Sequence, residues 1–225
     1  GSPERVGVRV MSGVPPAGRV GGAAVGRAQR DLRCMLGFSS CGHVGYLLLA
    51  MVATGDSGRN AGMAAILYYL AAYAFMNMGA FGVLVYWANR SNFADSLDEI
   101  AGAGRRFPWA AGIMALFMLS LTGVPPTAGF FAKFFMFSAV VDAGYAWLAV
   151  IGALFSLVSA FFYLRVIVYM YMREPERELK AVPESKSWDL GLGLGIAAAG
   201  VVLLGILPSP VLNAAQDAVV KLLGN

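Results

Sequence analysis

The sequence has little charge for its length. Of its 225 residues only 13% are charged, whereas 58% are hydrophobic, and the mean hydropathy is +0.66. An ordinary soluble domain has roughly 25% charged residues. A soluble fold of this size has too small an interior to hide so much apolar surface, so the composition excludes a soluble globular protein.

Side chains that bind metals or carry out covalent catalysis are also scarce. There are two cysteines and one histidine. Cys34 and Cys41 would share one helix face, but they cannot hold a metal alone, so we expect two packed thiols and no metal site. We find no phosphate loop, paired carboxylates or nucleophile–base pair, and therefore expect no active site for covalent chemistry. The net charge of +4 is spread over short loops, which argues against nucleic-acid binding.

Long apolar blocks dominate the rest of the chain. A bilayer core about 30 Å thick needs about 20 such residues per helix, and lipid offers no partner to unpaired backbone groups. The blocks predict an all-α, polytopic membrane protein with five transmembrane helices in one domain, residues 28–225. The predicted spans are residues 35–53, 63–87, 109–141, 146–172 and 190–207. Residues 1–27 show no helical period, and we interpret them as a disordered or non-native leader.

The loops between the blocks indicate an orientation. Lysine and arginine concentrate before the first span and in the loops after the second and fourth spans. The positive-inside rule therefore places the N-terminal side in the cytoplasm and the C-terminus outside. After the last span, residues 211–223 are predicted to form an amphipathic helix on the outer surface.

The third block is longer than one span and carries helix-breaking residues near its middle. These are Gly123, Pro125, Pro126 and Gly129. Two prolines remove backbone donors, so the third helix is expected to be discontinuous. Backbone groups freed at membrane depth are tolerated only where protein or water satisfies them, which predicts a hydrated pocket beside the break.

Lys133 follows this break and is flanked by four phenylalanines. An ammonium group in such surroundings is costly unless it is paired, hydrated or neutral. Burial favours the neutral form of a lysine, which is the property that a proton relay needs. The alternative is a lysine that extends to the membrane surface. The position of Lys133 within the apolar stretch favours the relay.

Three further ionisable residues are candidates for proton translocation. His43 lies inside the first span, either as a proton carrier or as a packing residue whose ring bonds a neighbouring backbone group or a hydroxyl, such as that of Ser39 or Ser40. Arg33 lies at the cytoplasmic edge of that span, where anchoring is the default role. Arg165 lies in the fourth span, where it either extends to the cytoplasmic surface or sets the charge near a relay group.

The second span carries polar residues at helical spacing, and these have two interpretations. They either line a water path or make hydrogen bonds between helices, and we favour the hydrogen bonds. They are Tyr68, Tyr69, Tyr73 and Asn77.

Three stretches, residues 29–46, 68–81 and 120–134, together resemble one family. They are similar to the tenth, eleventh and broken twelfth helices of the antiporter-like membrane subunits of respiratory NADH:quinone oxidoreductase (complex I). The third stretch is the most specific, and its lysine followed by an aromatic residue is most similar to the subunit N type. The resemblance covers the chain from about residue 28 and corresponds to the C-terminal part of the family's subunits, without their first inverted repeat.

The resemblance implies a role for Lys133 and a setting for the chain. Lys133 would be the terminal lysine of a proton half-channel that opens to the periplasm, driven by quinone reduction elsewhere in the complex. NADH, flavin, iron–sulfur clusters and quinone would be bound by other subunits, and no cofactor by this chain. Its partners would be other membrane subunits and the lipid bilayer, in the bacterial inner membrane. The family usually has a lysine where this chain has Arg33, and an arginine does not release its proton.

Two alternatives remain open at this point. One keeps the fold but places the chain in a multi-subunit cation/proton antiporter or a membrane-bound hydrogenase. The other is a truncated membrane scaffold that packs with partners but moves no proton.

Overall fold

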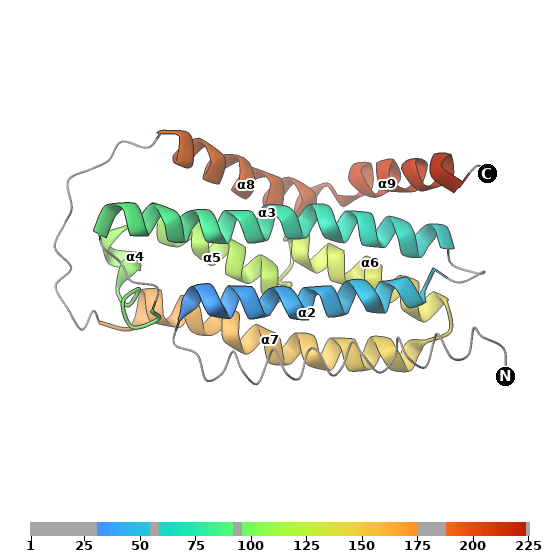
Figure 1. Ribbon diagram of the computed structural model, residues 1–225, viewed down its shortest axis with the longest axis horizontal. Coiled ribbons are helices and arrows are strands. Elements are labelled where there is room, and N and C mark those ends of the chain that lie inside the picture. Colours follow the sequence, from blue (N-terminus) through green and yellow to red (C-terminus); the bar gives the residue numbers. More distant parts are fainter. Residues whose placement is uncertain (1–30, 55–58, 92–95, 175–187, 224–225) are drawn as a thin grey trace.

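The computed structural model describes residues 31–54, 59–91, 96–174 and 188–223, which form a bundle of roughly aligned helices (Figure 1). The predicted leader, residues 1–27, lies outside the described residues. The helices are α2 (Leu32–Val52), α3 (Arg59–Ser91), α4 (Ala103–Arg106), α5 (Pro108–Thr122), α6 (Ala128–Asp142), α7 (Ala146–Met172), α8 (Trp188–Ile206) and α9 (Pro208–Leu223).

The five predicted crossings correspond to these helices. Four helices, α2, α3, α7 and α8, are long and apolar enough to cross a membrane. The third crossing is divided between α5 and α6, which have 15 residues each. Each half is about 22 Å long, shorter than a bilayer core of about 30 Å. Figure 1 shows the two halves following one another along the bundle, as the predicted discontinuity requires.

Local sequence explains where the helices begin and end. The Asp31 side chain caps α2 by accepting hydrogen bonds from the backbone N–H groups of Arg33 and Cys34, at 2.9 and 3.3 Å. Pro108 opens α5 at a position where no backbone donor is needed. Gly123 ends α5 in the left-handed conformation, with φ 93°, which a residue with a side chain rarely adopts.

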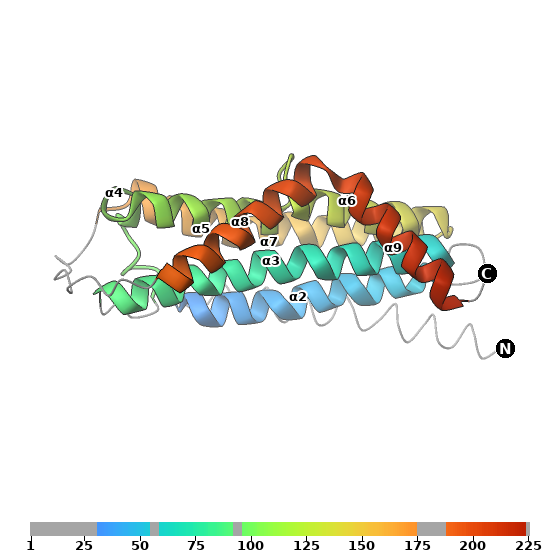
Figure 2. The ribbon, with the colours of Figure 1, turned by 90° about the horizontal axis from the view of Figure 1, so that it is seen from above.

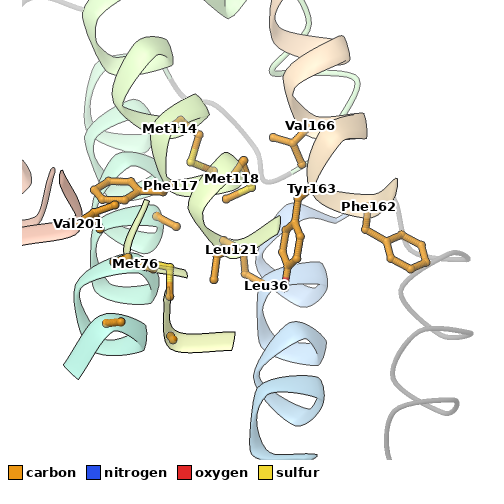
Figure 3. Packing of buried hydrophobic residues seen from close by; sticks show 14 of the residues in the cluster. Leu36, Met76, Met114, Phe117, Met118, Leu121, Phe162, Tyr163, Val166 and Val201 are labelled. Atoms are coloured by element: carbon orange, nitrogen blue, oxygen red, sulfur yellow. The ribbon is translucent and has the colours of Figure 1, made fainter. Parts of the chain in front are cut away.

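Close contacts between helices hold the bundle together. Lipid is as apolar as a leucine side chain, so helix association in a membrane depends on tight packing and hydrogen bonds. Phe117 of α5 is fully buried against Gly79 of α3, where an added Cβ atom would collide with the ring. Figure 3 shows Phe117 beside Val201, with Met76 nearby, where α3, α5 and α8 are in contact.

The C-terminal helix forms where the sequence predicts one, and it also packs against the bundle. The sequence predicts a helix at residues 211–223 on the outer surface, and α9 does form there. However, α9 packs against α3, with Val219 fully buried and Ala215 nearly so. Figure 2 shows α8 and α9 meeting at a bend, with their two outer ends near α3 and the corner near the start of α6. The buried side of α9 is therefore covered by protein, whereas Val220 and Leu222 remain exposed.

The expectation of two packed thiols is wrong. Cys34 and Cys41 both lie on the exposed side of α2. Their shared face points away from the bundle because the opposite face, which carries Leu36 and His43, is the buried one. Seven-residue spacing indicates a common face but not which face is buried.

Candidate functional site

The break between α5 and α6 leaves backbone carbonyls that need partners. The last four carbonyls of a helix have no partner within it. Here the N–H of Gly123 donates to the carbonyls of Leu119 and Ser120, both at 3.0 Å, and the N–H of Val124 donates to Leu119 at 3.1 Å. This glycine-terminated turn satisfies two of the four carbonyls. The carbonyls of Leu121 and Thr122 remain.

Lys133 supplies the missing donors. Its Nζ donates to the carbonyl of Leu121 at 2.9 Å and to that of Thr122 at 2.8 Å. It also donates to the hydroxyl of Ser156 on α7, at 2.9 Å. A cation at a helix C-terminus is favoured by the helix dipole. The break and the lysine therefore form one unit: α5 ends where α6 provides the ammonium group.

Ser120 fastens the start of α6 to the end of α5. Its hydroxyl accepts a hydrogen bond from the backbone N–H of Gly129 at 3.1 Å and lies 2.9 Å from the sulfur of Met76. The cap residue Thr127 does not make this bond, because its own hydroxyl donates to the Val124 carbonyl. Gly129 has no room for a side chain, since an added Cβ atom would overlap the Ser120 carbonyl.

The Lys133 side chain is enclosed but borders a pocket. It is only 7% exposed. A pocket of about 340 Å³ lies between α6 and α7 and includes Lys133 and Ser156 among its lining residues. Most of its wall is apolar, and Phe134 and Leu157, which are 54% and 72% exposed, stand at its edge. The pocket is large enough for a few water molecules, and the polar atoms of Lys133 and Ser156 are the groups to which such waters would bond.

Tyr46 connects the surroundings of Lys133 with those of His43. The Nζ of Lys133 lies 5.7 Å from the centre of the Tyr46 ring. The same ring meets the His43 imidazole edge to face, with 6.0 Å between centres. Tyr46 follows His43 by three residues on α2, which places both side chains on one face of that helix.

His43 is bonded to two tyrosines from other helices. Its Nδ1 lies 2.7 Å from the Tyr69 hydroxyl of α3, and its Nε2 lies 3.1 Å from the Tyr163 hydroxyl of α7. The expected partners, Ser39 and Ser40, do not bond the ring. Each hydroxyl can either donate or accept, so the imidazole can gain a proton at one nitrogen and lose one at the other.

Other tyrosine hydroxyls of the bundle also make hydrogen bonds between helices. Tyr163 is hydrogen-bonded to Ser39, and Tyr73 donates to Ser40 at 2.8 Å. Tyr68 donates to the Leu204 carbonyl of α8 at 2.6 Å. Hydrogen bonds between helices were the favoured interpretation of these tyrosines, and they are confirmed for Tyr68, Tyr69 and Tyr73.

The two arginine candidates do not join this cluster. Arg33 is exposed in the first turn of α2, ten residues or about 15 Å along the helix from His43. Arg165 is half-buried and donates to the hydroxyl of Tyr169 at 3.3 Å, one turn further along α7. The structure therefore brings Lys133 and His43 together through Tyr46, and leaves Arg33 and Arg165 as predictions.

Sequence reasoning missed three residues of the site. Ser156 and Tyr163 contact Lys133 and His43 from α7, and Tyr46 lies between them. Tyr46 and Tyr163 could have been suspected, because a hydroxyl inside an apolar span needs a partner. Ser156 has no such signal, since a serine in a helix can bond to its own backbone.

These features define a class: a polytopic membrane protein in which a broken helix buries a lysine at membrane depth. The family described as "NADH:quinone oxidoreductase/Mrp antiporter, TM" matches residues 16–162, and the chain belongs to this family.

Curated relatives point to one type of subunit within the family. NADH-quinone oxidoreductase subunit N 2 of Roseiflexus castenholzii is 44% identical over 194 residues, which are 85% of this chain and 38% of the relative. Subunit N of Chloroflexus aggregans is 39% identical over 215 residues, 96% of this chain and 43% of the relative. The chain thus spans about two fifths of the length of the curated relatives that it matches.

Solved structures share the fold. A chain of respiratory complex I from Thermus thermophilus with bound aureothin has a TM-score of 0.76 and 29% identity, and the match covers 92% of this chain and 45% of that chain. The Mrp complex from Dietzia sp. has a TM-score of 0.78 at 20% identity, covering 97% and 47%. The second likeness shows the fold alone.

Proposed function

We propose that the chain acts as part of a proton-translocating membrane subunit of an NADH:quinone oxidoreductase, with Lys133 as the group that takes up and releases the proton. The observation that carries the proposal is the Lys133 ammonium group, buried at the break of a transmembrane helix and bonded to three oxygen atoms beside a pocket. The redox reaction is inferred from the curated relatives, which are NADH-quinone oxidoreductase subunits.

The surroundings of Lys133 suit a group that changes its charge. Two backbone carbonyls and one hydroxyl stabilise the ammonium form, while burial favours the neutral form. The helix break brings the carbonyls to the lysine, and the adjoining pocket gives a released proton a place to go. The cost of burying the charge and the stabilisation by these three oxygen atoms therefore oppose each other at Lys133, as proton exchange requires.

The setting of the chain follows from its relatives. They are bacterial, and we place the chain in the inner membrane with other membrane subunits as neighbours. NADH oxidation and quinone reduction belong to other subunits in this proposal. A cation/proton antiporter keeps the same fold, but identities of 39 to 44% to NADH-quinone oxidoreductase subunits favour the redox-driven complex.

The test is proton pumping by the assembled complex with Lys133→Ala. Membrane vesicles carrying the variant should retain electron transfer from NADH to quinone but lose most of the proton gradient that it generates. Lys221→Ala is the matched control, because Lys221 lies in α9, away from the break. Full pumping by Lys133→Ala would refute the role of Lys133, and absence of the subunit from an NADH-oxidising assembly would favour the antiporter or scaffold alternative.

A further inference from the structure

Among the described residues, the Lys133 ammonium group donates to two backbone oxygens and to one side-chain oxygen. The carbonyls of Leu121 and Thr122 lie at the end of α5, whereas the Ser156 hydroxyl comes from α7. A backbone carbonyl remains whatever side chain is present. Of these three bonds, the one to Ser156 is therefore the one that a side-chain substitution can remove.

Ser156 also lines the pocket between α6 and α7, as do Thr122 and Gly123 at the end of α5. The ammonium group thus lies between a fixed helix end and the hydroxyl of a neighbouring helix. Its bond to Ser156 is the one that α7 contributes beside the pocket.

We propose that Ser156 is a positioning residue for proton exchange at Lys133. Its hydroxyl stabilises the ammonium form and holds Nζ at the pocket, so that the proton leaves on that side. This inference rests on the proposed function of Lys133. It adds that α7 sets the protonation equilibrium of a lysine carried by α6.

Neighbouring serines on α7 supply a control. Ser159 lies one turn beyond Ser156, but its hydroxyl donates to the Phe155 carbonyl of its own helix, at 3.0 Å. Ser159→Ala removes one hydroxyl oxygen from α7, as Ser156→Ala does, but it leaves the hydrogen bonds of Lys133 in place. Ser156 is half-buried at a pocket, which leaves space for the extra methyl group of threonine.

The experiment measures NADH-driven proton pumping, relative to NADH oxidation, as a function of pH in the assembled complex reconstituted in vesicles. We expect wild-type pumping to fall at high pH, where Lys133 no longer takes up a proton. Loss of one acceptor makes the ammonium form less favourable, so in Ser156→Ala this fall should occur at lower pH. A charge-assisted hydrogen bond predicts a move of about one pH unit, a tenfold change in proton affinity. Ser156→Thr should restore the wild-type profile, and Ser159→Ala should leave it unchanged.

Two results would overturn the inference: an unshifted profile in Ser156→Ala, or equal shifts in Ser156→Ala and Ser156→Thr. If Ser156→Ala does not assemble, Ser156→Cys decides, because a thiol of similar size accepts hydrogen bonds weakly and should give a smaller shift in the same direction. Lys133→Ala separates the two proposals. Normal pumping in Lys133→Ala defeats the proposed function, whereas impaired pumping there with an unshifted Ser156→Ala profile defeats only the role of Ser156.

Discussion

The Lys133 and His43 sites are both buried polar centres, but they are built from different parts. Lys133 is bonded mainly to backbone carbonyls that a broken helix exposes. His43 is bonded to tyrosine hydroxyls, and the helix that carries it is continuous. A cation needs several oxygen atoms that approach it closely, and a helix end supplies them together. A neutral imidazole needs one donor and one acceptor, which two hydroxyls provide.

The difference teaches where each site is vulnerable. The Lys133 site depends on the backbone geometry of the break, so small changes in shape should damage it most. The His43 site depends on side chains from three helices, so single hydroxyl groups can be removed without changing the path of the backbone. Tyr46 lies between the two and allows the connection itself to be tested.

The largest effect should come from changing the shape of the break. In Gly129→Ala the new methyl group would overlap the Ser120 carbonyl, so α6 would have to move away from α5. We expect a loss of about 3 kcal/mol or more in stability, and little assembled subunit. The measurement is the amount of the subunit in isolated complexes, together with the temperature at which they unfold.

Gly112→Ala is the control for that change. Gly112 also lies in this broken crossing, but an added Cβ atom there would meet open space. It should assemble normally. Equal assembly of the two variants would mean that the break does not need close approach at Gly129.

A smaller effect is expected when the His43 site loses its imidazole. His43→Phe removes both hydrogen bonds of the ring and leaves the Tyr69 hydroxyl without this partner. A double-mutant cycle of His43→Phe and Tyr69→Phe, followed by thermal unfolding, should give a coupling energy of about 0.6 to 1.7 kcal/mol. Additive effects would show that the bond between His43 and Tyr69 contributes nothing to stability.

The smallest effect should come from Tyr46. Replacement by leucine removes the ring near the Lys133 ammonium group. The Nζ lies 5.7 Å from the ring centre, close to the limit of about 6 Å for a cation–π interaction, so we expect a contribution at the weak end of the range, about 0.5 to 1 kcal/mol. Tyr46→Leu should therefore lower pumping by about two- to fivefold, and Tyr46→Phe, which retains the ring, should lower it less. Equal losses in the two variants would assign the effect to the hydroxyl group instead of the ring.

Much of the fold could be predicted because membrane helices leave strong local signals. Apolar length identified the crossings, and the proline pair identified the broken one. The position of α9 could not be predicted in the same way. An amphipathic helix has one apolar side whether it lies on a membrane or against another helix, and only the packing against α3 decides between them.

The site was predictable at its centre but not in its contacts. Lys133 stands out because a charge in an apolar span is costly. Its partners come from residues 11 to 23 positions away, and those of His43 from 26 to 120 positions away. Such pairings depend on how helices pack, which periodicity within one helix does not encode. The same reason explains the wrong expectation for the cysteines, and why the hydroxyls that bond His43 belong to tyrosines of other helices.

The most direct test of the central claim is the number of protons pumped per electron transferred by the assembled complex with Lys133→Arg. A guanidinium group keeps the positive charge at the break but does not release its proton. If Lys133 exchanges the pumped proton, the ratio should fall nearly as far as in Lys133→Ala while electron transfer continues. A wild-type ratio in Lys133→Arg would contradict the account, because a fixed charge would then be sufficient.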